Sequence, residues 1–259
     1  MNMHITPGWT RHRSAAGAKP PPATAYLARL LVRALLLAAA GTACGGGAAW
    51  LAQRPRFDFH RIEVAGDLRH VSRAAIRGAI AGRLAGNFFT MRLGDARAVF
   101  ETLPWVASAS VRRVWPNRLV VTLVERRALG IWSDGRVLSD AGVLFYANPG
   151  EAELDGPQVE FSGPPRLAAD AVEKLRDFRA ALGAMPATVV AIDISDRASW
   201  TLRTSAGQAV DLGRDDPPGS VQARLATIVA SYPTVVAQLS GPPTRIDARY
   251  SNGFAATRQ

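Results

Sequence analysis

A stretch of twenty residues without a charged side chain, Ala34–Gln53, most constrains what this 259-residue chain can fold into. At ~1.5 Å per residue, a helix of that length covers ~30 Å, the thickness of a bilayer's hydrocarbon core. Residues 1–33 carry five basic residues and no acid, which favours keeping that end in the cytoplasm. We therefore expect a disordered cytoplasmic tail at residues 1–26, one membrane-spanning helix at residues 27–53, and the remaining chain outside the cytoplasm.

Two other interpretations of this segment stay open. A cleaved signal peptide would use Leu35–Ala43 as its short apolar region. A lipoprotein signal would use Cys44, although Gly41 stands three residues before it, where a bulky aliphatic residue is expected. The spacing of Gly41 and Gly45 is also compatible with helix pairing in the membrane.

Charge is distributed unevenly along the chain, whose formal net charge is +10. Residues 54–127 hold fourteen arginines against six acids, whereas residues 128–259 hold more acids than bases. A basic block directly after a membrane span favours anionic headgroups or an acidic protein partner. A merely solvated arginine-rich face remains an equal alternative, and nucleic acid is not expected as a partner outside the membrane.

Apolar periodicity predicts five elements in the first seventy residues after the span. We expect Ser72 to cap the first helix, Asp95 to cap the second, and Pro104 to end it. The two following strands are joined by a turn at residues 115–118. The predicted order is strand, helix, helix, strand, strand, at residues 57–64, 72–83, 95–103, 106–114 and 119–125.

After residue 128 the pattern changes to short strands separated by turns. Two helices are predicted among them, at residues 167–182 and 220–232. The strands are expected near residues 188–194, 200–204, 208–212, 244–250 and 254–256.

Residues suited to catalysis are scarce in the exported part of the chain. Its only histidines are His60 and His70, both predicted to lie at the surface, and the single cysteine, Cys44, lies in the span. A histidine-based triad or metal site is therefore excluded beyond residue 70. The acids stand at turn and cap positions, which turn chemistry explains. We expect no catalytic residue, no metal ligand and no cofactor, and interpret the chain as an anchored binding protein.

Three segments carry a resemblance to a known family. They are Leu103-Pro-Trp-Val followed by Val111-Arg-Arg-Val-Trp-Pro116, then Leu138–Phe145, and finally Asp247–Phe254. From about Phe57 to the end, the sequence resembles the bacterial FtsQ/DivIB family of cell-division proteins. The resemblance implies an α+β fold: one transmembrane helix, a POTRA domain at residues 57–126, and a C-terminal mixed β-domain with two helices at residues 127–259.

The same resemblance implies a non-enzymatic scaffold of the division septum in the inner (plasma) membrane. Such proteins link early cytoplasmic and late periplasmic components by binding FtsB and FtsL, and their POTRA domain is tied to FtsK. The alternative is a membrane-anchored POTRA chaperone for exported proteins. Trp105 and Trp115 are expected to pin the strand hairpin to the helices, and Arg112 and Arg113 to point to opposite faces of their strand.

The end of the chain is the candidate binding site. A last strand would offer unpaired backbone groups to an extended partner segment. The resemblance places the FtsB contact on Arg249, Tyr250, Asn252, Gly253, Phe254 and Ala255, and Arg197 is a candidate second cation for acidic residues of the partner. The aromatic residue that the family has near its last residues is replaced here by Arg258.

Overall fold

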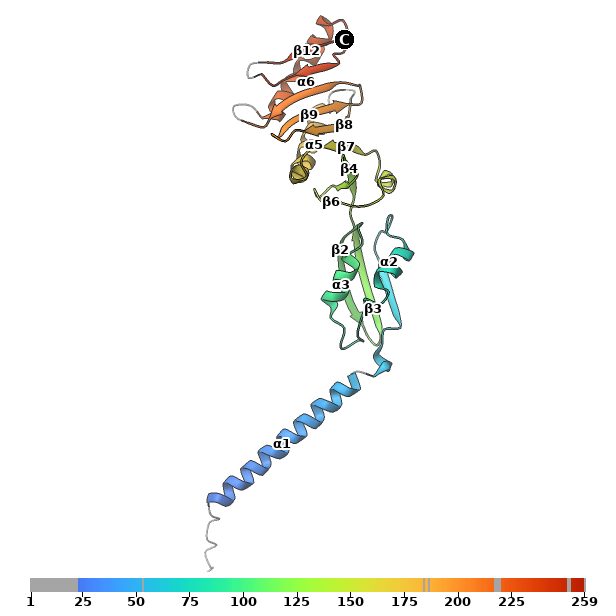
Figure 1. The fold of residues 1–259 in the computed structure, drawn as a ribbon, viewed down its shortest axis with the longest axis vertical. Coiled ribbons are helices and arrows are strands. Elements are labelled where there is room, and N and C mark those ends of the chain that lie inside the picture. Colours follow the sequence, from blue (N-terminus) through green and yellow to red (C-terminus); the bar gives the residue numbers. More distant parts are fainter. Residues whose placement is uncertain are drawn as a thin grey trace, which may run out of the picture. The chain divides into compact units, whose positions relative to one another are not determined.

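The computed structural model describes residues 23–52, 54–183, 185, 187–216, 220–250 and 253–258, which form two compact units, 1–56 and 57–259. In the first unit, helix α1 spans Ala23–Ala52 (Figure 1), and the turn η1 follows at Pro55–Phe57. Within α1, Tyr26–Ala52 is long and apolar enough to cross a membrane, and none of it is buried. The predicted single membrane-span candidate is confirmed. Gln53 and most of the predicted tail lie outside the described residues.

The first part of the second unit, which we call the three-stranded module, follows the predicted order of elements. Strand β3 lies in the middle of its sheet, parallel to β1 and antiparallel to β2. Phe100, Leu119 and Val121 are fully buried between the sheet and the two helices. The elements are β1 Arg61–Ala65, α2 Arg73–Ile80, α3 Leu93–Glu101, β2 Val106–Val114 and β3 Arg118–Glu125.

Local chemistry explains where these elements begin. The Ser72 hydroxyl accepts the Ala75 N–H at 3.1 Å, which confirms the predicted helix cap. The predicted cap by Asp95 is wrong, because α3 begins at Leu93 and Asp95 lies in the first turn of the helix. A negative charge at that position interacts favourably with the helix dipole. The first strand begins at Arg61 instead of Phe57, because η1 ends at Phe57 and residues 58–60 belong to neither a helix nor a strand.

The remaining chain forms a nine-stranded module around one mixed sheet. The strand order is β12-β11-β10-β9-β8-β7-β4-β5-β6, with parallel pairs at β10–β11, β7–β8 and β4–β7. Its elements are β4 Ala128–Trp132, β5 Val137–Ser139, β6 Leu144–Phe145, α4 Pro149–Ala152, η2 Glu153–Asp155, β7 Val159–Ser162, η3 Pro165–Leu167, α5 Ala168–Leu182, β8 Val189–Ile194, β9 Ser199–Thr204, β10 Ala209–Arg214, α6 Val221–Gln238, β11 Arg245–Asp247 and β12 Ala255–Thr257.

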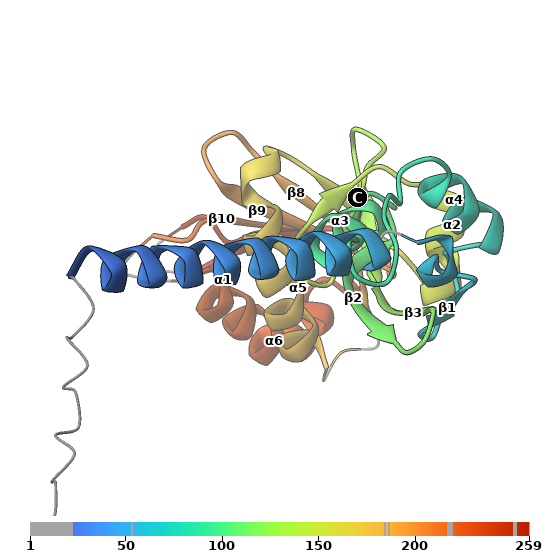
Figure 2. The ribbon, with the colours of Figure 1, turned by 90° about the horizontal axis from the view of Figure 1, so that it is seen from below.

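Helices α5 and α6 lie side by side over one face of this sheet (Figure 2). Phe178 and Leu225 of these helices pack with Trp200 and Leu202 of β9 in the main core. On the other face, alternate residues are polar and pair across the strands: Thr201 with Asp211 at 3.0 Å, and Arg203 with Glu160 at 3.2 Å. The predicted α+β fold class is confirmed.

Several elements of this module differ from the expectation. Strand β11 covers Arg245–Asp247 instead of residues 244–250, so Arg249 and Tyr250 follow the strand, and helix α4 was not predicted. Helix α6 continues past Pro233 to Gln238, whereas the sequence predicted its end at Tyr232. Helical hydrogen bonding resumes after the proline, since the Leu239 N–H bonds the Val235 carbonyl at 2.9 Å. Strand β7, Val159–Ser162, was not predicted, because four residues are too short to show an alternation; it lies inside the sheet between β4 and β8.

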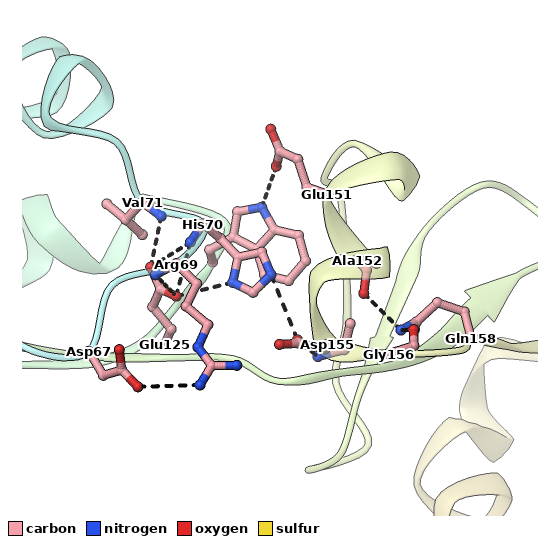
Figure 3. Close-up of polar contacts among 12 residues, drawn as sticks. Asp67, Arg69, His70, Val71, Glu125, Glu151, Ala152, Asp155, Gly156 and Gln158 are labelled. Carbon is pink, nitrogen blue, oxygen red and sulfur yellow. Dashed lines mark hydrogen bonds and ion pairs between the residues drawn. The ribbon is translucent and has the colours of Figure 1, made fainter.

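The two modules meet at a buried polar cluster centred on Glu125, the last residue of β3 (Figure 3). Its carboxylate accepts the backbone N–H groups of Arg69, His70 and Val71, the last at 2.7 Å, and contacts the His70 ring at 3.1 Å. Burial opposes the charge of Glu125, but these hydrogen bonds outweigh it and lower the pKa of the carboxyl below its usual value.

His70 connects Glu125 to the nine-stranded module. Its side chain is only 2% exposed, its Nε2 lies 3.8 Å from the Asp155 carboxylate, and its ring stacks on Trp105 with centroids 3.9 Å apart. Trp105 in turn donates its Nε1–H to Glu151 of α4 at 2.7 Å. This cluster therefore joins elements of both modules.

Three expectations about single residues are wrong here. His70 is buried at the junction, although His60 is exposed as predicted. Trp105 packs with Phe145 and Ala152 of the nine-stranded module, so it joins the modules instead of holding the hairpin to the helices. Trp115 is 71% exposed in the turn between β2 and β3 and pins nothing in the core.

Candidate protein-binding edge

Strand β12 is the edge of the nine-stranded sheet (Figure 1, in red). Ala255, Ala256 and Thr257 pair with Asp247, Ile246 and Arg245 of β11 in antiparallel register. Within the part of the chain that the structure describes, no strand pairs with the other side of β12. An edge of this kind presents unpaired N–H and C=O groups on which a further strand can form.

The backbone direction of β12 follows from one hydrogen bond. The Thr257 carbonyl accepts the Thr244 N–H at 2.9 Å, so the backbone of Thr257 faces β11. Because successive residues of a strand direct their backbone groups to opposite sides, the backbone groups of Ala256 face the free side. Thr257 was not among the predicted site residues. From Phe254 to Thr257, half-buried and exposed side chains alternate, and Thr257 is exposed.

The two predicted aromatic residues lie in different environments. Tyr250 is 61% exposed after β11 and is available to a partner. Phe254 is half-buried and packs, with Ala256, against the main core. Phe254 therefore holds β12 to the domain, whereas Tyr250 offers apolar area at its surface. Gly253 and Ala255 are exposed beside them, and Asn252 lies outside the described residues.

Arg249 carries an exposed positive charge whose position is fixed by Asp247. Its guanidinium makes two hydrogen bonds to that carboxylate, Nε to Oδ1 at 2.9 Å and Nη2 to Oδ2 at 2.6 Å. These hydrogen bonds lower the pKa of Asp247 against the opposing effect of burial, and they raise the pKa of Arg249. On the neighbouring strand, Asp211 is paired in the same way with Arg245 at 2.6 Å. The two carboxylates, which face each other across β10 and β11, are thus each neutralised by an arginine.

Arg197 lies in the turn between β8 and β9 and belongs to the same end of the sheet. It lines a cleft of about 430 Å³ together with Arg214, the last residue of β10. Gly213, beside Arg214, adopts φ +76°, which favours glycine. The Arg249 side chain packs closely on this glycine, since a Cβ there would lie 3.2 Å from Arg249 Cγ. Among the residues described, Arg197 has no ion pair within 4 Å, so its guanidinium is available to an acidic group.

Four of the other charged residues that line the cleft are paired within the domain, whereas Asp170 and Glu173 form no ion pair among the described residues. Lys174 bonds Asp215 at 2.5 Å, and Arg214 bonds Asp216 at 2.8 Å. Burial alone would raise the pKa of Asp215, but the hydrogen bonds from Lys174 and from the Val221 N–H lower it below its usual value. Through its bond from the Val221 N–H, Asp215 holds the start of α6 near the sheet, and Arg197 is the one cation of the cleft that no ion pair among the described residues neutralises. Sequence patterns could not reveal this cleft, because its residues come from three separate segments.

Arg258 is exposed, and its guanidinium is bonded within the same module. Its guanidinium donates to the carbonyl groups of Leu239, at 3.1 Å, and Ser240, which follow helix α6. These carbonyls have no partner inside the helix, so an arginine there satisfies them and ties β12 to α6. The residue therefore stabilises the edge strand from within the domain.

Comparison with known proteins covers both modules. A family model described as POTRA domain, FtsQ-type, matches residues 57–126, and one described as Cell division protein FtsQ/DivIB, C-terminal, matches residues 130–249. The chain is 42% identical over 90% of its length to the cell division protein FtsQ of Burkholderia pseudomallei, covering 89% of that protein. It is 37% identical to FtsQ of Bordetella pertussis, over 88% of this chain and 87% of that one. It is 33% identical to FtsQ of Thiomonas arsenitoxydans, over 81% and 78% of the two chains.

Proposed function

This chain belongs to the FtsQ family of cell division proteins, and we propose that it is a non-enzymatic, membrane-anchored scaffold of the bacterial division machinery. In this role it links early cytoplasmic components to late periplasmic ones. The scaffold role is supported by the family match of both modules and by edge strand β12, which is suited to protein binding.

We propose that the nine-stranded module binds FtsB, and through it FtsL, by adding a strand of the partner to β12. The observation that carries this proposal is the free side of β12, to which the Ala256 backbone groups point. Backbone hydrogen bonds would supply the affinity, and neighbouring side chains would select the partner. Tyr250 would pack on the added strand, and Arg249 and Arg197 would favour acidic residues on the partner.

The proposed topology follows from the candidate span. Residues 1–26 would form a cytoplasmic tail, residues 27–53 the helix in the inner membrane, and residues 57–126 and 127–259 the periplasmic POTRA domain and C-terminal β-domain. The three-stranded module would contact FtsK at the septum. A periplasm-active reporter fused after Gln259 is expected to be active. An active cytoplasmic reporter at the same position would contradict this orientation.

The alternative role, an anchored chaperone for exported proteins, rests on the POTRA domain alone. The match of residues 130–249 to the FtsQ/DivIB C-terminal family favours the division scaffold, because a chaperone role does not call for that domain.

The binding edge can be tested in cells by photocrosslinking. A photoreactive amino acid at Thr257, next to the free edge, is expected to crosslink to FtsB. The matched control is Tyr146, which is 77% exposed and follows β6 at the opposite edge of the sheet. Crosslinking to FtsB from Tyr146 and none from Thr257 would contradict the proposed edge.

A further inference from the structure

Two large apolar side chains are exposed at one end of the three-stranded module. Trp115 is 71% exposed in the turn between β2 and β3, and Phe89 is 50% exposed in the loop before α3. Neither position follows from the scaffold function proposed above. A tryptophan with an apolar ring and a polar N–H suits a boundary between apolar and wet surroundings.

Contacts in the structure place both residues at the end where the module begins. Phe57, the first residue of the unit, packs edge-on against Phe89 with ring centroids 4.9 Å apart. The His60 N–H donates to the Asn117 carbonyl at 3.1 Å, which ties the same segment to the Trp115 turn. The register agrees, since the first residues of β1 and β3 are partners.

The segments that carry these aromatic residues also carry basic side chains. The three segments that form this end, 57–63, 83–95 and 112–118, contain six arginines and three acids. Arg61 and Arg118 share one carboxylate, Glu63, at 3.9 and 3.3 Å. The Arg92 side chain is 85% exposed and lies 3.9 Å from Asp95, and Arg83 is exposed. We call Phe57, Phe89, Trp115 and these arginines, Arg61, Arg83, Arg92 and Arg118, the aromatic–arginine face.

Chain length limits how far this face can be from a bilayer. The candidate span ends at Ala52, and Phe57 follows five residues later. Five residues reach at most about 18 Å when fully extended. The headgroup layer itself is roughly 5–7 Å thick on each side, the difference between the ~30 Å core and the ~40–45 Å bilayer.

We propose that the aromatic–arginine face rests on the bilayer surface where the chain emerges. Trp115 and Phe89 lie at the boundary between headgroups and acyl chains, where tryptophan is enriched in membrane proteins. The exposed arginines contact the phosphates of anionic lipids. The module would then be held by two membrane contacts, the helix and this face, which fixes its orientation. This inference rests on the anchoring helix of the proposed function and is independent of the binding edge.

The fluorescence of Trp115 in the full chain tests the proposal. The protein is placed in nanodiscs of phosphatidylglycerol or phosphatidylcholine, with and without bromine on the acyl chains, which quenches tryptophans at membrane depth. Subtracting the emission of the Trp115→Phe variant isolates the Trp115 signal. Trp105, Trp132 and Trp200 are buried and common to both samples.

We expect the Trp115 signal to be blue-shifted and largely quenched by brominated phosphatidylglycerol, and less so by brominated phosphatidylcholine. The double variant Arg83→Ser/Arg92→Ser should lower the ratio of protein with Trp115 at the membrane to protein with Trp115 in water. The expected decrease is about fivefold for each arginine. The matched control is Tyr146→Trp in the Trp115→Phe background, an equally exposed tryptophan on the nine-stranded module, which should stay unquenched.

A Trp115 signal that resembles the Tyr146→Trp control in both lipids would overturn the proposal. Loss of anchoring would be seen separately, as failure of the chain to enter nanodiscs at all, and would remove the premise of both proposals. Equal quenching in the two lipids, unchanged by Arg83→Ser/Arg92→Ser, would overturn the assignment of the arginines to anionic headgroups.

Discussion

Replacing Glu125 with glutamine tests whether the polar cluster at the junction stabilises the fold. Glu125 is 8% exposed, and its two oxygens accept three backbone N–H groups and contact the His70 ring. Glutamine keeps the shape but retains one acceptor oxygen, and it turns an NH2 group toward donors. Hydrogen bonds to a charged group contribute about 1.5–3 kcal/mol each, and glutamine cannot accept all of those that Glu125 accepts. We expect Glu125→Gln to lower the free energy of unfolding by roughly 1.5–3 kcal/mol, the contribution of one such hydrogen bond.

Urea denaturation of residues 57–259, followed by far-UV circular dichroism, measures this loss. Glu153→Gln, an exposed acid of η2, is the matched control and should change stability by less than about 0.5 kcal/mol. The pH dependence has a definite sign. Because the folded-state pKa of Glu125 lies below its unfolded value of ~4.3, its contribution is complete above that pH and is lost as the pH falls through the folded-state pKa. The difference between wild type and Glu125→Gln should therefore shrink in acid. A loss no larger than that of Glu153→Gln at neutral pH would refute the reasoning.

Four further predictions concern the junction and the binding edge. Trp105→Phe removes the N–H that donates to Glu151 and part of the junction packing, so thermal or urea unfolding should show a loss of about 1.5–3 kcal/mol. Tyr250→Ala should leave stability within about 0.5 kcal/mol of wild type and weaken FtsB binding by about 1–3 kcal/mol. Phe254→Ala, by contrast, should lower stability by roughly 1–3 kcal/mol, below the cost at a fully buried site. Arg249→Glu should slow association with FtsB, as stopped-flow mixing would show, more than it alters unfolding; an unchanged rate would argue against an acidic partner surface.

Local patterns allowed much of this fold to be predicted from the sequence. The span follows from composition, the start of α2 from the Ser72 cap, and the β2–β3 hairpin from two strand-like runs around a turn. What could not be predicted depends on residues far apart in the chain. His70 looked like a surface residue because its partners, Glu125 and Asp155, follow 55 and 85 positions later.

Some features of the candidate site could likewise be predicted from the sequence, and others could not. That the last strand of the chain lies at an edge of the sheet could be predicted, and the structure places β12 there. The sequence could not predict that Tyr250 is exposed and Phe254 packs against the core, because this depends on which side chain faces the helices across the sheet. The exposure of Trp115 could not be predicted either. A tryptophan beside a turn can be buried in the core or exposed at the surface, and the sequence pattern is the same in both cases.

The affinity of the Ala256→Pro variant for FtsB tests the central claim most directly. Proline removes the N–H that faces the free side of β12, and Thr257 still bonds Thr244 through its carbonyl. Titration calorimetry of residues 57–259 with the periplasmic part of FtsB gives the dissociation constant. Val172→Ala, a buried position on α5, controls for general destabilisation. We predict that the Ala256→Pro protein stays folded and binds FtsB more weakly by roughly 1–3 kcal/mol. The Val172→Ala protein should bind FtsB with wild-type affinity. A folded Ala256→Pro protein with wild-type affinity would contradict strand addition at β12.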